Sequence, residues 1–178
     1  ANGLITKDPR GHWIAEKVTP ATLRNLYELR WLLEPAALLD SAPKVPKEKI
    51  DEIWRRLKTT IARFRQASSV DLDQIEQDLH GSLVEHCGNK PLLRVLGQTR
   101  LLIIATRYVF DGYPSISMAF SKQSALEHLR VVERLRAGDY AGAGDALGDH
   151  LRKSLDHWIR RLEHVNLVAE PPMPDFLL

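Results

Sequence analysis

The feature that most constrains the fold is a recurrence of apolar residues at helical spacing, interrupted by proline and glycine. It is clearest between residues 47 and 67, where the apolar positions are Ile50, Ile53, Trp54, Leu57, Ile61 and Phe64. Spacing of i, i+3 and i+4 is typical of an amphipathic helix with one buried face. The same period predicts helices at about 20–40, 71–86, 89–109, 117–137 and 140–165. The sequence therefore predicts an all-α protein, an antiparallel bundle of six to seven helices.

Two segments lie outside this pattern. Residues 3–16 contain two short β-prone pieces around a Lys-Asp-Pro-Arg-Gly turn, which predicts a hairpin. A lone hairpin is only marginally stable in water, so we expect it to be the remainder of a larger upstream element. The proline-rich segment at residues 167–178 should have an extended backbone. The predicted organisation is a hairpin at 1–18, a helical domain at 19–166 and a tail at 167–178.

Charge and composition exclude several classes of protein. With 25 basic and 23 acidic residues, the net charge of +2 indicates no large field for binding a polyanion. The apolar run at 101–105 is far shorter than the roughly 18 residues of a membrane span, and the start lacks the pattern of a secretory signal. The single cysteine, Cys87, leaves no internal disulfide and fits a reducing compartment. We expect a cytoplasmic protein.

Histidines at helical positions are the candidate metal ligands. Glu76 and His80 are four residues apart, which places both on one helical face. His128 and His150 fall on two further predicted helices, and side chains from facing helices are how bundles build metal sites. Three imidazoles and a carboxylate would suit zinc first, with nickel, manganese or iron as alternatives. The competing interpretation is that these histidines are separate, exposed groups, as we expect of His157.

Three arginines are candidate anion clamps, because a guanidinium offers a planar fork that fits a carboxylate. They are Arg30, Arg100 and Arg107. For Arg30 the alternative is an ion pair with Glu34 at i+4, and for the other two it is an ordinary helix-surface charge. Asn89 is a further candidate effector contact, although its place before Lys-Pro also predicts a helix cap.

Three sequence blocks resemble the FCD effector domain of FadR-type regulators in the GntR superfamily. They are LYELRWLLEP, EQDLHGSLVEHCGNKPLL and EHLRVVERLRAGDYAGAGDALGDHLRKSL, and the resemblance covers about residues 20–165. Its strongest part is the pair His128 and His150, which flank residues 137–139 at the separation expected of this family. The family typically binds a divalent metal with one aspartate and three histidines. The resemblance implies that His80, His128 and His150 are ligands and that Glu76, one methylene longer, occupies the aspartate position.

The N-terminal hairpin is similar to the wing that ends the family's winged helix-turn-helix domain. Such regulators are usually homodimers whose paired DNA-binding heads contact pseudo-palindromic operators. The resemblance thus implies a ligand-sensing domain of a bacterial transcription regulator, not an enzyme, with a small carboxylate effector contacted by Arg30, Asn89 and Arg107. Two alternatives are a metal-dependent hydrolase with a three-histidine site and a purely structural dimerisation bundle.

Overall fold

The computed structural model of the protein describes the backbone of residues 5–7, 9–11, 13–15, 19–111 and 122–168, and side chains at 9–11, 19–103 and 122–160. These residues form two strands, β1 (Ile5–Lys7) and β2 (Trp13–Ala15), and six α-helices. The helices are α1 (Pro20–Ser41), α2 (Lys47–Ala62), α3 (Ser69–Gln77), α4 (Lys90–Asp111), α5 (Lys122–Arg136) and α6 (Tyr140–Val168). The predicted all-α class is confirmed.

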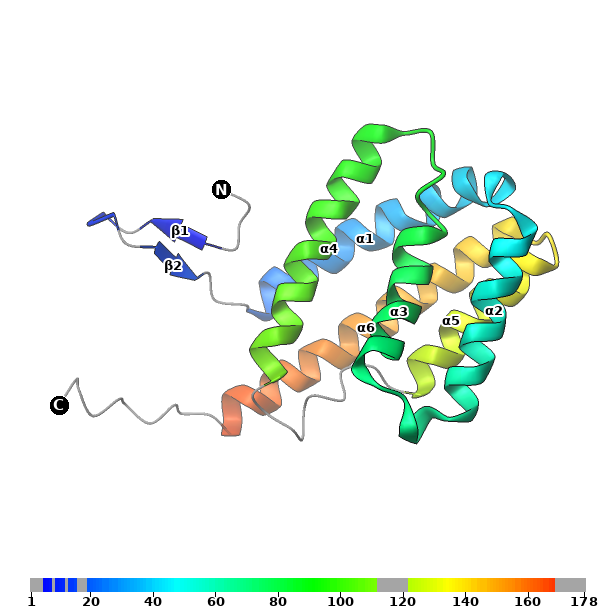
Figure 1. The fold of residues 1–178 in the computed structure, drawn as a ribbon. Helices are drawn as coiled ribbons and strands as arrows, with labels where there is room; N and C mark the ends of the chain where they lie inside the picture. The colour runs from blue at the N-terminus through cyan, green and yellow to red at the C-terminus, as the bar shows by residue number, and fades with distance from the viewer. Residues whose placement is uncertain (1–4, 8, 12, 16–18, 112–121, 169–178) are drawn as a thin grey trace.

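The two strands form a short antiparallel hairpin, with Ile5 opposite Ala15 and Lys7 opposite Trp13. Its turn contains Gly11 at φ +85°, a backbone conformation that glycine adopts without steric cost. Figure 1 shows β1 and β2 next to the start of α1. The interpretation of this hairpin as the wing of a DNA-binding domain stays a prediction.

Helix α1 begins with a conventional cap and continues through a proline. The Thr22 N–H donates to Thr19 Oγ1 over 3.1 Å, and Pro20 occupies the first turn, where a missing N–H costs nothing. Pro35 inside the helix removes one backbone donor. The helix nevertheless continues, because Ala37 and Leu38 beyond the proline are fully buried and need helical geometry to reach the core.

The helices surround one hydrophobic core. Helix α1 packs against α6, which runs in the opposite direction, and against α4, while α5 lies between α2 and α6 (Figure 1). The largest fully buried aliphatic side chains come from five of the helices and the turn after α3, and include Leu38, Ile53, Ile75, Leu83, Val131 and Leu147. None of the described helices combines the length and apolarity that a membrane crossing needs.

The region around α3 differs from the sequence expectation. Helix α2 ends at Ala62 instead of reaching residue 67, and a 3-10 turn, Phe64–Gln66, follows it. Ser68 caps α3 through a capping box in which Ser68 and Asp71 each bond the other's backbone N–H. The predicted helix 71–86 is also too long, because α3 ends at Gln77 and continues as a π-helical turn, Asp78–Ser82.

The connection between α5 and α6 follows the prediction. Gly138 has φ +76°, and the Gly142 N–H donates to Asp139 Oδ1 over 2.9 Å, so a glycine ends one helix and an aspartate caps the next. The start of α5 that was expected at residue 117 lies outside the described residues. The core-facing stripe of α5 runs through Ala125, Leu129 and Val132, whereas Leu126 is 42% exposed.

Candidate metal centre

The three histidines on the buried faces come from separate elements. His80 lies in the π-helical turn after α3, His128 in α5 and His150 in α6. His128 and His150 are each eleven positions from Asp139, where the chain reverses. Two antiparallel helices that pack against each other bring such positions face to face, which explains why this pair meets.

The three imidazoles converge on one point inside the bundle. One ring nitrogen from each histidine can be chosen so that all three lie within 4.8 Å of one another. The Nε2 atoms of His128 and His150 are 3.2 Å apart, and the ring centroid of His80 lies 5.2 Å from that of His128. The side chains are buried, with exposed fractions of 6% for His80, 0% for His128 and 3% for His150. The interpretation of these histidines as separate surface groups is therefore wrong.

Glu76 lies beside this cluster. Its Oε1 atom is 3.5 Å from His128 Nε2, and its side chain is a quarter exposed. The π-helical turn begins two residues after Glu76, in a region where the sequence predicted a regular helix. Such turns are frequent at functional sites. Here Glu76 and His80 both remain next to His128, although the backbone between them is not uniformly α-helical.

Two buried carboxylates that the sequence analysis did not select contact the Nδ1 atoms of two of the histidines. Glu34 Oε2 lies 2.8 Å from His80 Nδ1, and Glu127 Oε2 lies 2.9 Å from His150 Nδ1. Glu34 is 2% exposed and Glu127 is 7% exposed. A signal was present for Glu34, because with Arg30 it puts two charged residues on the otherwise apolar stripe of α1.

Arg30 and Glu34 form a buried ion pair, which confirms the alternative considered for Arg30. Arg30 Nε donates to Glu34 Oε1 over 2.7 Å, and Arg30 Nη2 donates to Glu34 Oε2 over 3.3 Å. Burial alone would raise the pKa of Glu34, but Arg30 and the hydrogen bond from His80 outweigh it and hold the pKa at about 2. Burial likewise lowers the pKa of Arg30, but Glu34 and Tyr27 more than reverse this, so the guanidinium stays charged.

Burial also controls the charge of the histidines. The pKa of His128 falls well below its ordinary value of 6.5, first because the ring is buried and then because His150 and His80 are close. The pKa of His80 is lowered by burial and by Arg30, against the opposing effect of Glu34. Both rings are therefore neutral at pH 7, which is the form that binds metal ions.

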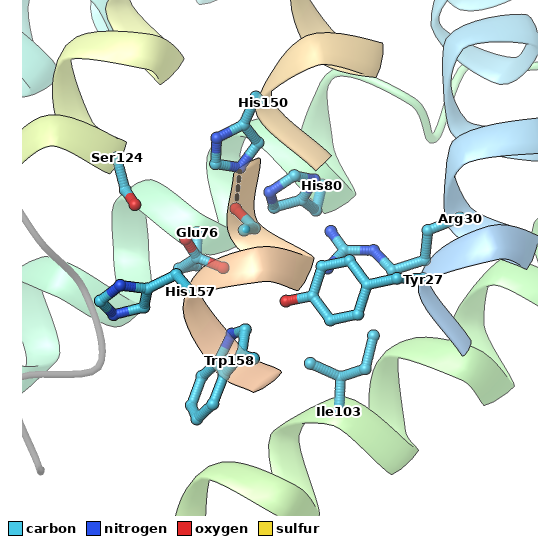
Figure 2. A pocket seen from close by; sticks show the side chains of 10 residues that line it. Tyr27, Arg30, Glu76, His80, Ile103, Ser124, His150, His157 and Trp158 are labelled. Atoms are coloured by element: carbon cyan, nitrogen blue, oxygen red, sulfur yellow. Dashed lines mark hydrogen bonds between the residues drawn. The ribbon is translucent and has the colours of Figure 1, made fainter. Parts of the chain in front are cut away.

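A pocket opens beside the cluster (Figure 2). Its cavity is about 30 Å³, and Glu76, His80 and His150 form part of its wall. The rest of the wall is Tyr27, Arg30, Ile103, Ser124, Ser154, His157 and Trp158. Ser154 Oγ lies 3.4 Å from His150 Nε2. The wall thus combines hydroxyl groups, a cation and aromatic rings next to the histidines, as expected of a site for a small polar ligand.

The remaining candidates have other surroundings. Asn89 caps α4, since its Oδ1 accepts the Leu92 N–H over 3.0 Å, and it is not among the described residues that line the pocket. The side chain of Arg107 lies outside the described residues. Arg100 bonds Gln77 at the surface, whereas His157, expected to be exposed, is half-buried in the pocket wall.

The donor atoms fit a first-row divalent ion. With ligand bonds of about 2.1 Å, neighbouring donors lie about 3.0 Å apart in an octahedron and about 3.4 Å apart in a tetrahedron. The 3.2 Å between His128 Nε2 and His150 Nε2 and the 3.5 Å from His128 Nε2 to Glu76 Oε1 lie in or next to this range. Three imidazoles and one carboxylate could hold such an ion without large movements of the backbone.

Comparisons with known proteins agree with this architecture. The family model of the FCD domain matches residues 25–153. A solved structure, the metal-free FCD domain of TM0439, a candidate transcriptional regulator, superposes with a TM-score of 0.68 over 84% of this chain and 99% of that one, at 21% sequence identity. No curated protein matched the sequence. The match of the family model over most of the chain, on a fold of the same kind, shows that this protein belongs to the FCD domain family.

Proposed function

We propose that this chain is the ligand-sensing domain of a bacterial transcription regulator and that it binds a divalent metal and a small carboxylate effector. His80, His128 and His150 are the metal ligands, with Glu76 as the fourth. The observation that carries the proposal is the convergence of three buried imidazoles from separate elements on one point. Membership of the FCD family supports the regulatory role.

Zinc is the first choice of metal, with nickel, manganese and iron as alternatives. Imidazole nitrogen and carboxylate oxygen are good ligands for all four ions. A bound ion would supply Lewis-acidic coordination positions for the oxygens of an effector. The protein contributes buried rings and a neighbouring carboxylate, which together remove the need to bury an uncompensated cation.

The effector site is the pocket beside the histidines. The wall of this pocket offers Arg30 together with the hydroxyl groups of Tyr27 and Ser154. Arg30 contributes the nitrogen that its bonds to Glu34 do not use. Asn89 is not part of this proposal, because its side chain caps α4. Arg107 stays a predicted contact.

Helix α1 is the route by which binding would reach DNA. It carries Tyr27 and Arg30 in the pocket wall and begins at Pro20, and β2 of the proposed wing ends at Ala15. A ligand that favours one position of α1 would shift the relative placement of the two DNA-binding heads of a homodimer. Operator binding by the full-length regulator, measured with and without effector, tests this step.

The metal site is tested by elemental analysis and zinc titration of protein purified without a histidine tag. We expect one metal per chain in the wild type and a large loss of affinity in His128→Ala. His86→Ala is the matched control, because that side chain is over a third exposed and pairs only weakly with Glu85, at 3.8 Å. Equal zinc affinity in the wild type and His128→Ala would contradict the proposed site.

The effector is tested by thermal shift with a panel of small organic acids, with and without zinc. We expect stabilisation by one chemical group of acids in the zinc-loaded protein and little in the metal-free protein. If no acid stabilises the loaded protein, the proposed sensing role is wrong. Turnover of a substrate that stops on chelation would instead support the hydrolase alternative.

A further inference from the structure

We propose that Glu34 and Glu127 are positioning residues that hold His80 and His150 with the proton on Nδ1 and the Nε2 lone pair turned to the shared centre. The proposal rests on the metal centre described above, but it concerns the ring tautomers of the protein itself. It assigns a role to two side chains that the sequence analysis did not select as part of the site.

The hydrogen bonds determine the tautomer. An ionised carboxylate can only accept, so the nitrogen that faces it must carry the proton. Glu34 lies 2.8 Å from Nδ1 of His80, and Glu127 lies 2.9 Å from Nδ1 of His150. A neutral imidazole carries one proton, so in the neutral form of either ring Nε2 keeps its lone pair, which is what a metal ligand needs.

Each of these two carboxylates also has a second partner besides the histidine that it contacts. Arg30 donates two hydrogen bonds to Glu34, and Gln123 donates to Glu127 over 3.2 Å, with the Lys153 ammonium 3.8 Å away. Because Glu34 and Glu127 are both buried, neither can turn to solvent without losing these partners. The orientation of His80 therefore depends on α1, and that of His150 on α5.

Helix α5 contributes two adjacent residues, Glu127 and His128, to the site. Neighbouring residues on a helix point about 100° apart, so Glu127 and His128 can reach His150 from different sides. Glu127 contacts Nδ1 of His150, while His128 Nε2 lies 3.2 Å from its Nε2. The carboxylate beside His128, that of Glu76, instead lies 3.5 Å from its Nε2. Two of the three rings should therefore depend on a carboxylate at Nδ1, and the third should not.

The tautomers can be measured without any metal. In metal-free protein labelled with ¹⁵N-histidine, long-range ¹H–¹⁵N correlation spectra report which ring nitrogen carries the proton. We expect protonated Nδ1 and unprotonated Nε2 at His80 and His150, each assigned by comparison with a single histidine variant. Protonated Nε2 at both rings in the wild type would overturn the proposal.

The same spectra test each carboxylate. Glu127→Gln keeps the size of the side chain but can present an amide N–H to the ring, so the fraction of His150 protonated at Nδ1 should fall while His80 is unchanged. Glu34→Gln should change His80 and leave His150 unchanged. Glu133→Gln is the matched control, because Glu133 lies on α5 and is exposed. Unchanged spectra in both Glu127→Gln and Glu34→Gln would refute the assignment.

Zinc affinity tests the consequence for binding. Loss of such an outer carboxylate typically weakens metal binding about 10- to 100-fold, so we expect this loss in Glu127→Gln and none in Glu133→Gln, with circular dichroism showing that both fold. If the wild type binds zinc and Glu127→Gln binds it equally well, the positioning role is wrong and the metal centre stands. If the wild type does not bind zinc, the metal centre is wrong, and the tautomer spectra alone decide this proposal.

Discussion

Replacing Arg30 by methionine should destabilise the metal-free protein more than any loss of a surface charge. Arg30 is 5% exposed and Glu34 is 2% exposed, so Arg30→Met leaves a carboxylate charge buried without its cation. Removing one partner of a buried ion pair costs about 3–5 kcal/mol. The pKa of Glu34, which Arg30 and His80 together lower to about 2, agrees in direction with a carboxylate that is stabilised in its charged form.

The pH dependence of this cost follows from the depressed pKa. Glu34 contributes stability that is fully present above pH 4.5 and is lost as the pH falls towards about 2. In Arg30→Met this contribution is missing, and burial then favours the protonated carboxyl. The difference in stability between wild type and variant should therefore be largest near pH 7 and should shrink as the pH falls below 4.5.

Urea unfolding of the metal-free protein at several pH values measures this difference. Lys49→Met is the control, because Lys49 belongs to an exposed pair with Glu52, at 3.5 Å, and such pairs contribute about 0–1 kcal/mol. The double variant Arg30→Met/Glu34→Gln should recover part of the loss, because the buried charge is gone. A cost for Arg30→Met below about 1 kcal/mol, or one that does not change with pH, would refute the reasoning.

Three further predictions test other parts of the structure. Zinc at about 100 times its dissociation constant should stabilise the wild type by about 2.7 kcal/mol and raise its melting temperature by about 5–10 °C, and His128→Ala should show no such shift in calorimetry. Asp40→Asn should lower the melting temperature at pH 7, because hydrogen bonds from Lys44 and the Gly88 N–H hold the pKa of Asp40 at about 2. The difference in melting temperature between the variant and the wild type should shrink as the pH falls from 3.8 towards 2, and a difference independent of pH would contradict this reasoning. Gly81→Ala should change the unfolding free energy by less than about 1 kcal/mol, because the added Cβ meets the flexible side chains of Gln77 and Arg100, which can move aside. A loss above about 2 kcal/mol would show that these side chains cannot move.

The sequence predicted most of the helical architecture from local physics. The period of the apolar residues, the proline breaks and the Gly138-Asp139 turn depend on neighbours within a few positions, and they hold in the structure. The errors occurred on either side of α3. Helix α2 ends at Ala62, before the Ser68 cap of α3, and in the turn Asp78–Ser82 the chain adopts a π-helical geometry that the residue pattern did not predict.

The candidate ligands were accessible from the sequence, but their surroundings were not. His80, His128 and His150 were selected because histidines on buried helical faces are unusual and because they match a family pattern. Glu34 and Glu127 escaped selection because their partners are 46 and 23 residues away in the chain. Contacts at such separations depend on how helices are rotated and packed against one another.

The sequence by itself thus determined the helices, the turn between the last two of them, and the residues suited to bind a metal. Only the tertiary structure decided that His80, His128 and His150 meet, that Arg30 is already bound to Glu34, and that two carboxylates contact two of the imidazoles. The physical reason is that helix formation depends on local hydrogen bonds and apolar spacing, whereas a site inside a bundle depends on the packing of all its helices at once.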